Sequence, residues 1–308
     1  MRPAQGIKAQ PTERPDPGRW LSTARHNRRR TLALATLSLV ALGSVALLLL
    51  AKLSSSDTTP RPSTLIDVES ERTSAKPSLD ALPSARGIRR AREFATNREG
   101  RVAFAVVDTS GDLTCYRCRV RYRSASVVKA MLLFAYLNQL ARTNEPLTAD
   151  HEEDLHSMIR VSDNDAATAI WTHVGKEELS KLGAQAQMTG FAVSDSWGSA
   201  RITAGDQARF FAGMVDLTAP AYRDYARALL LSIAADQSWG IPEVARPQWQ
   251  VFFKGGWLTS ARGSLVHQVA RLESERSSLA IAVLTDRNPS DSYGRETIRG
   301  IAERLLTR

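Results

Sequence analysis

The sequence predicts an α+β protein in which strands from both ends of one domain form an antiparallel sheet. Two strand-like segments come first, a long stretch with few strand signals follows, and three strand-like segments precede a closing amphipathic helix. The chain has 308 residues, of which 43% are hydrophobic, so it can bury a full-sized core. We therefore expect five strands in one sheet, with helices packed against it.

The N-terminal elements of this domain follow one another closely. Residues 86–97 have the pattern of a helix, and the apolar run 102–108 predicts a strand. The turn-forming residues 109–112 then predict a hairpin whose second strand is 113–121. A buried helix should begin near Ser126, because a long apolar run follows that serine.

The C-terminal elements complete the α+β pattern. From the buried helix to about residue 245 the chain is mostly helical, with few strand signals. Residues 251–256, 263–272 and 278–286 predict three strands joined by turns. Residues 292–306 predict the closing helix, which has isoleucines and leucines on one side.

The chain before this domain divides into three parts. Residues 1–30 are rich in arginine and proline and predict a disordered arm, and residues 31–51 are uncharged and long enough to cross a bilayer as a helix. Residues 52–85 read as a flexible linker to a domain at 86–308. Because the basic arm precedes the apolar run, we expect a single-pass cell-membrane protein with a cytoplasmic N-terminus and an extracytoplasmic domain.

A cleaved signal peptide is the alternative reading of this N-terminal segment, since Arg28, Arg29 and Arg30 loosely resemble a twin-arginine signal. The apolar run is long for a signal peptide, and no Ala-x-Ala cleavage site follows it. We therefore favour an uncleaved anchor.

The basic charge of the chain does not indicate nucleic-acid binding. The formal net charge is +9, but residues 1–30 alone carry eight basic and two acidic residues, so the excess belongs to a short arm. Cys115 and Cys118 lie on a predicted strand, where alternate side chains face apart, and a free pair and a local disulfide both stay open. His151 and His156 are not aligned on a helix, so we expect no metal and no cofactor.

The first candidate motif is Ser126-x-x-Lys129 at the start of the buried helix. On a helix the two residues share one face, so the amine can reach the hydroxyl, and a buried lysine can lose its proton and act as a base. A serine at this position could equally be an ordinary helix cap. The downstream motifs decide between these readings.

Two further candidate motifs follow later in the chain. Ser162-Asp163-Asn164 precedes an alanine-rich segment, so it could simply cap a helix. In Lys254-Gly255-Gly256, two glycines within a strand suggest that something approaches the backbone closely.

Together and in this order, the three motifs resemble those of the penicillin-recognising serine enzymes, the class A β-lactamases and penicillin-binding proteins. The resemblance covers about residues 86–308 and implies a β-lactamase/transpeptidase-like fold, in which the short segment between Lys129 and Ser162 departs from the family pattern and predicts a reduced helical block. It also implies that Ser126 is the acylated nucleophile and Lys129 its base or proton relay.

The resemblance implies roles for the other motif residues as well. Ser162 would pass a proton to the leaving nitrogen, and Asn164 would hold the substrate amide. Lys254 would stay charged and attract the substrate carboxylate, beside Gly255 and Gly256. The backbone N–H groups of Ser126 and Trp257 would form the oxyanion hole.

The sequence departs from the family pattern at two positions that matter for chemistry. Gly255 replaces the usual threonine or serine, so a hydroxyl donor to the substrate carboxylate is missing. Gly198, after Trp197, replaces the glutamate that activates the deacylating water in class A β-lactamases. Asp195 is the nearest acid but is not a convincing substitute. Without that base, deacylation should be slower by about 10²–10⁴-fold.

The sequence thus predicts an enzyme: a membrane-anchored, extracytoplasmic serine hydrolase acylated by a β-lactam or a peptidoglycan-like peptide of the D-Ala type. We expect it to be a monomer with weak β-lactamase turnover. The alternative is a non-catalytic cell-wall or β-lactam binding or sensor domain on the same fold. An esterase or peptidase acting on another acyl substrate is a third possibility.

Overall fold

The computed structural model describes residues 82–246, 248–275 and 277–307. Within these residues, no helix is both long enough and apolar enough to cross a membrane. The predicted arm, the predicted span at 31–51 and nearly all of the predicted linker lie outside the described residues, so the membrane anchor stays a prediction.

Five antiparallel strands form the main sheet, in the spatial order β2-β1-β7-β6-β5. The strands are β1 (Arg101–Val107), β2 (Leu113–Tyr116), β5 (Gln250–Ser260), β6 (Gly263–Glu273) and β7 (Ser278–Asn288). All of β1 pairs with β7, from Arg101 opposite Asp286 to Val107 opposite Ala280. This confirms the predicted α+β class and the pairing of strands from both ends of the domain.

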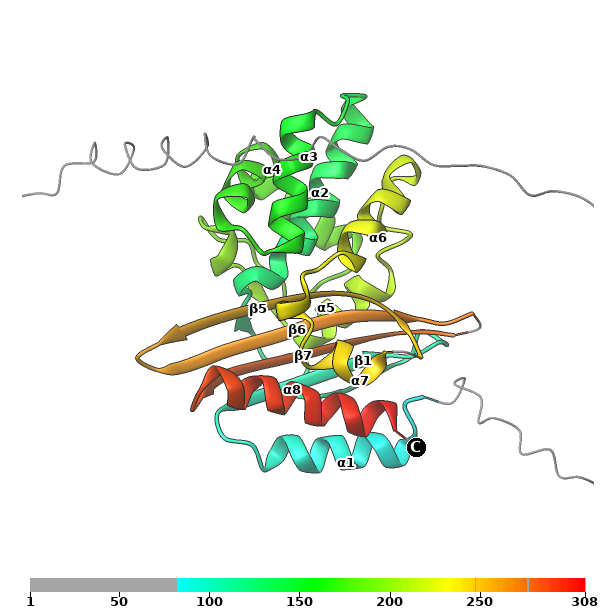
Figure 1. The fold of residues 1–308 in the computed structure, drawn as a ribbon, viewed down its shortest axis with the longest axis vertical. Coiled ribbons are helices and arrows are strands. Elements are labelled where there is room, and N and C mark those ends of the chain that lie inside the picture. The colour runs from blue at the N-terminus through cyan, green and yellow to red at the C-terminus, as the bar shows by residue number, and fades with distance from the viewer. Residues whose placement is uncertain (1–81, 247, 276, 308) are drawn as a thin grey trace, which may run out of the picture. The chain divides into compact units, whose positions relative to one another are not determined.

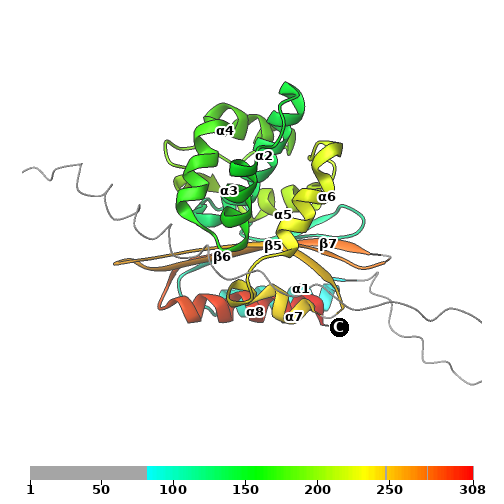
Figure 2. The ribbon, with the colours of Figure 1, turned by 45° about the horizontal axis from the view of Figure 1, so that its top comes forward.

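Helices cover both faces of this sheet, as Figures 1 and 2 show. One face carries the N- and C-terminal helices of the domain and a short one between them: α1 (Ala85–Thr96), α7 (Ile241–Ala245) and α8 (Asp291–Leu306). The other face carries the helical block: α2 (Val128–Thr143), α3 (Ala149–Arg160), α4 (Asn164–Gln185), α5 (Ala204–Ala212) and α6 (Arg223–Leu231). Sheet and helices together bury one continuous hydrophobic core.

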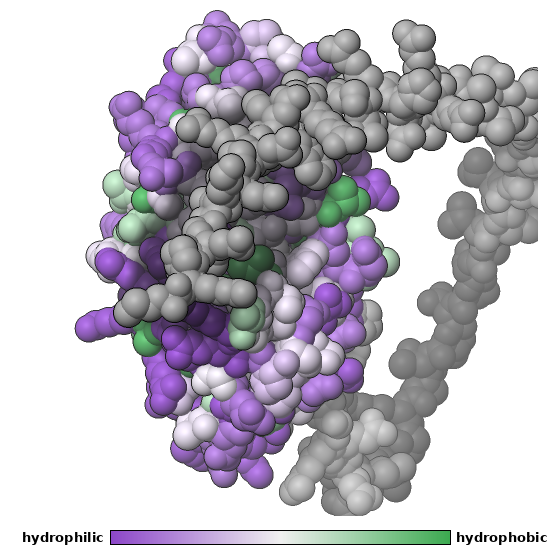
Figure 3. All heavy atoms as spheres, turned by 90° about the vertical axis from the view of Figure 1, so that its left-hand side faces the viewer, coloured by the Kyte–Doolittle hydropathy of each residue, from purple (hydrophilic) through white to green (hydrophobic). Residues whose placement is uncertain are grey.

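The central helix α2 is apolar around most of its circumference, and it is accordingly deeply buried. Every residue from Val128 to Leu137 is buried. The part of the face in Figure 3 that grey atoms leave visible is largely hydrophilic, with small, separate hydrophobic groups. The hydrophobic core therefore fixes α2, and with it the residues that precede it.

The predicted strand at 113–121 is wrong in its second half. Strand β2 ends at Tyr116, because Arg117 takes a left-handed backbone conformation with φ of 50° and turns the chain. The turn brings the Cα atoms of Cys115 and Cys118 to 5.5 Å, and the two residues form a disulfide. A two-residue strand, β3 (Tyr122–Arg123), then pairs with β4 (Arg201–Ile202).

Candidate active site

Ser126 lies in a single 3-10 turn, Ala125–Val127, which leads directly into α2. The turn starts from an unusual backbone conformation, since Ala125 has φ of 45°. A non-glycine residue in this left-handed region costs about 1–2 kcal/mol. The neighbouring Val127 and Val128 are fully buried, so the core holds the half-buried serine at a fixed place despite this strain.

Strand β5 approaches the Ser126 backbone through the second glycine of the third motif. A Cβ atom added to Gly256 would lie 2.9 Å from the backbone nitrogen of Ser126 and 2.8 Å from that of Val127. Only glycine allows this separation. The close approach predicted from the two glycines is thus confirmed, and it brings Trp257, the next residue, beside the serine turn.

Lys129 is fully buried and contacts the second motif. Its Nζ atom donates to the Ser162 carbonyl oxygen at 2.6 Å and to Asn164 Oδ1 at 2.8 Å, and lies 3.4 Å from Ser162 Oγ. Within the described chain, these hydrogen bonds go to the second motif and none goes to Ser126. Burial lowers the pKa of Lys129 to about 8, although the Asp163 carboxylate opposes the shift. The amine is thus partly neutral near neutral pH, as a base must be.

Lys254 reaches the same hydroxyl from strand β5. It is fully buried, and its Nζ atom donates to Ser162 Oγ at 3.1 Å and to the Gly255 carbonyl oxygen at 3.2 Å. Burial, together with the nearby Lys129 ammonium, lowers the pKa of Lys254 to about 7. Near neutral pH the group is therefore charged only part of the time.

The Ser162-Asp163-Asn164 motif serves both as a helix cap and as a contact for the two lysines. Asp163 caps α4, because its Oδ1 atom accepts a hydrogen bond from the Ala166 backbone N–H at 2.8 Å. Ser162 has φ of 60°, and this left-handed conformation accompanies the turn of its hydroxyl toward the lysines. The helix-cap reading thus holds for Asp163, whereas Ser162 and Asn164 contact the buried amines.

Trp197 is a site residue whose side chain the sequence analysis assigned no role. Its ring centroid lies 4.8 Å from Lys129 Nζ, and its Nε1 atom donates to Thr168 Oγ1 at 3.2 Å. The adjacent Gly198 therefore lies close to the reactive groups. A Cβ atom at Gly198 would meet nothing within 4 Å, so a side chain could begin at this position without a clash.

Asp195 is poorly placed to act as a base instead. Its side chain is 94% exposed and forms an ion pair with Lys176. That ammonium group holds the pKa of Asp195 below its ordinary value, so the carboxylate is a weak proton acceptor.

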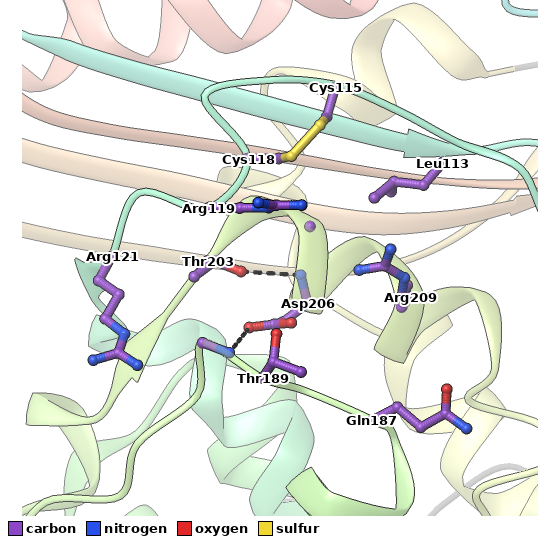
Figure 4. Close-up of a pocket in the computed structure, with 12 residues that line it drawn as sticks. Leu113, Cys115, Cys118, Arg119, Arg121, Gln187, Thr189, Thr203, Asp206 and Arg209 are labelled. Carbon is purple, nitrogen blue, oxygen red and sulfur yellow. Dashed lines mark hydrogen bonds between the residues drawn. A yellow bond between two sulfur atoms is a disulfide. The ribbon is translucent and has the colours of Figure 1, made fainter.

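A separate cavity of about 760 Å³ lies between the end of β2 and the start of α5 (Figure 4). The disulfide, Arg119 and Arg209 line it, and at its floor the Asp206 carboxylate accepts a hydrogen bond from the Gly190 backbone N–H at 2.9 Å. None of the residues that line it belongs to the three motifs. Over the described residues, no group of three or more His, Cys, Asp or Glu side chains could hold a metal ion.

The fold and the meeting of the three motifs define a β-lactamase-like protein of the penicillin-recognising serine hydrolase superfamily. Residues 143–308, more than half of the chain, match the model of the beta-lactamase enzyme family. The chain belongs to this family. The matched range includes the second and third motifs and begins after the first. None of the curated proteins matches the chain in sequence.

Solved structures with this fold include several β-lactamases that share little sequence with the chain. The β-lactamase from Sphaerobacter thermophilus superposes with a TM-score of 0.64 at 19% identity, covering 71% of this chain and 95% of its own. The β-lactamase from Streptosporangium roseum gives a TM-score of 0.62 at 19% identity, with 72% and 97% covered. The one from Chitinophaga pinensis gives 0.64 at 14% identity, with 71% and 98% covered.

The tight contact at Gly256 predicts a strong effect of one methyl group. Gly256→Ala should destabilise the protein by about 1–3 kcal/mol and slow any acylation of Ser126, because the serine turn must move away from β5. Chemical unfolding measures the first effect. Gly198→Ala is the matched control, since its Cβ has open space, and should change stability by less than about 0.5 kcal/mol. If Gly256→Ala and Gly198→Ala were equally stable, β5 would not pack tightly against the serine turn at Gly256.

The buried Lys254 predicts that stability rises with pH. Its folded-state pKa of about 7 lies below the ordinary value of 10.5, so between these values the unfolded chain binds more protons. Its unfavourable contribution is greatest below pH 7 and disappears as the pH approaches 10.5. The free energy of unfolding of the protein, minus that of Lys254→Met, should therefore rise from pH 7 toward pH 10, by up to roughly 1.4 kcal/mol per pH unit.

Urea unfolding at several pH values measures this difference. Lys176→Met, which removes an exposed lysine, is the control and should show no comparable rise. A difference between protein and Lys254→Met that stays constant with pH would show that Lys254 keeps its ordinary pKa in the folded state.

Proposed function

We propose that this protein is a serine acyl-enzyme in which a β-lactam, or a peptidoglycan-like peptide of the D-Ala type, acylates Ser126. The observation that carries the proposal is the Ser162 hydroxyl, which lies within 3.1 Å of Lys254 Nζ and 3.4 Å of Lys129 Nζ. Two buried amines around one hydroxyl form a short path for a proton. Burial lowers the pKa of both amines, so each can exchange a proton near neutral pH.

In the acylation step, the Ser126 Oγ atom attacks the acyl carbon and its proton passes to neutral Lys129, one helical turn later. The bond between Oγ and the acyl carbon forms, and the bond between that carbon and the leaving nitrogen breaks. Lys129 then gives a proton to Ser162, and Ser162 gives its own proton to the leaving nitrogen. The products are an ester at Ser126 and a free amine, with both lysines in their initial protonation states.

Two further groups of residues would support this step. The backbone N–H groups of Ser126 and Trp257 would stabilise the negative oxygen of the tetrahedral intermediate. Their candidacy rests on the close packing of Gly256 against the nitrogen of Ser126. Asn164 would hold the substrate amide, and its Oδ1 atom meanwhile orients Lys129.

The ester formed at Ser126 should be long-lived in water. Gly198, which follows Trp197 in the chain, has no carboxylate to activate a water molecule. Asp195 is exposed and paired with Lys176. We expect deacylation to be slower by about 10²–10⁴-fold than with a well-placed base. The β-lactamase turnover of the protein should accordingly be weak.

We place this reaction outside the cytoplasm, on a domain anchored by residues 31–51. The uncharged length of that segment and the basic residues before it support the anchor and its orientation. The Cys115–Cys118 disulfide supports an oxidising compartment, since disulfides persist outside the cytoplasm.

The proposal predicts that a fluorescent penicillin labels the protein covalently at Ser126. Labelling should be absent in Ser126→Ala, and Lys129→Ala should acylate about 10²–10⁴-fold more slowly because it lacks the base. Gel fluorescence and mass spectrometry of the labelled peptide measure both. Ser180→Ala, which alters an exposed serine on α4, is the control and should label normally. Reversible binding without an adduct would instead identify a non-catalytic binding or sensor domain.

The open space at Gly198 predicts that the missing base can be restored. Gly198→Glu should shorten the lifetime of the acyl-enzyme by about tenfold or more, part of the roughly 10²–10⁴-fold that a well-placed general base contributes. Mass spectrometry of the decaying adduct measures this lifetime. Gly198→Gln has nearly the same shape without a basic group, so its adduct should persist. Equal decay in the two variants would exclude base catalysis from this position.

A further inference from the structure

The face of strand β5 that points away from the serine turn is aromatic. Side chains alternate along a strand, so Gly255 and Trp257 share the face opposite to Lys254 and Gly256. A Cβ atom at Gly255 would lie 3.3 Å from Trp239 Cζ2 and 3.7 Å from Trp257 Cζ3. The two indole rings meet edge to face, with their centroids 6.3 Å apart. They therefore fill the space in which the family pattern has a threonine or serine hydroxyl.

Two cations near this part of β5 are already engaged. Lys254 is fully buried and donates to Ser162 Oγ and to the Gly255 carbonyl oxygen. The Arg295 guanidinium lies 4.9 Å from the centroid of the Trp239 ring and pairs with Asp291 at 2.5 Å. Neither of these two cations is free to pair with a carboxylate placed here, which would lose water without gaining either of them, and that is unfavourable.

The strand next to β5 also presents uncharged residues to this face. Gln268 lies opposite Gly255, and Val266 lies opposite Trp257. The Gln268 side chain is committed to backbone groups, since it donates to the Trp239 carbonyl oxygen at 2.6 Å and accepts from the Ile241 N–H at 2.7 Å. It is therefore not free to bind an anion.

Apolar surface is exposed at the same end of β5. Trp257 is 37% exposed and Leu258 is 40% exposed, and they are two of the four exposed large hydrophobic side chains among the described residues. Trp257 directly follows Gly256, which packs against the backbone nitrogen of Ser126. The indole lies on the opposite face of β5 from the serine turn, but β5 is the edge strand of the sheet, so the exposed ring offers a contact surface for an uncharged group of a substrate bound along that edge.

We propose that the acyl donor for Ser126 carries an uncharged aromatic or aliphatic group, packed on Trp257, at the position where a β-lactam carries its carboxylate. This inference rests on the acylation of Ser126 under the proposed function. It changes the substrate class from anionic to neutral acyl compounds. Trp239 holds the Trp257 ring in place and keeps residue 255 without a side chain.

Three matched probes test this inference: benzylpenicillin, its methyl ester and its benzyl ester. The rate constant for adduct formation at Ser126, measured by mass spectrometry of the intact protein, should increase in that order. Trp257→Ala should reduce the advantage of the benzyl ester over the free acid by about two- to twelvefold, since an aromatic contact is lost. A free acid that reacts tenfold faster than both esters would overturn the inference.

Two more variants keep the test decisive. Trp257→Arg places a cation on the same face and should shift the preference toward the free acid, even if Trp257→Ala folds poorly. Leu231→Ala removes another exposed apolar side chain, on α6, and should leave the order of the three probes unchanged. An unchanged order in Trp257→Arg would assign the selectivity to another surface.

The outcomes also separate this inference from the proposed function. If none of the three probes forms an adduct at Ser126, the acyl-enzyme function itself fails. If adducts form with the free acid strongly preferred, the acyl-enzyme function stands and only the neutral substrate class is excluded.

Discussion

The hydroxyl of Ser162 between two buried amines is the interaction on which the rest of the site depends. An isolated ammonium group in a protein interior loses its hydration, and a second one nearby adds repulsion. Hydrogen bonds offset part of these two costs. Lys129 and Lys254 both donate to Ser162, and Lys129 also donates to Asn164. The hydrogen bonds do not offset these costs completely, and the remaining desolvation and repulsion lower the pKa values of both lysines.

Three separate parts of the fold must be held together for this hydroxyl to lie there. Lys129 comes from the buried helix α2, Ser162 from the turn before α4, and Lys254 from strand β5. The core fixes α2, and the absence of a side chain at Gly256 lets β5 approach the serine turn. Strain is concentrated at the same place, since Ala125 and Ser162 both adopt left-handed backbone conformations.

The sequence predicted those features of the fold and site that depend on local patterns. The order of apolar runs predicted the five strands, and the two glycines after Lys254 predicted the close backbone approach. It could not predict that the chain turns at Arg117, since the alternation from Leu113 to Arg121 is typical of one strand and the disulfide depends on that turn. Trp239 could not be found either, because it lies 16 residues before Gly255 and only the packing of β5 brings the two together. The depressed pKa values likewise follow from burial in three dimensions.

The pairing of β1 with β7 has a consequence for the synthesis of the protein. Arg101 pairs with Asp286, which follows it by 185 residues, so strand β1 lacks one of its two neighbours until almost the whole chain has left the ribosome. Until then β1 has an open edge that other chains can join. Long-range closure of this kind is slow compared with helix formation. A nascent chain of this family therefore needs its unfinished sheet shielded from aggregation during most of its translation.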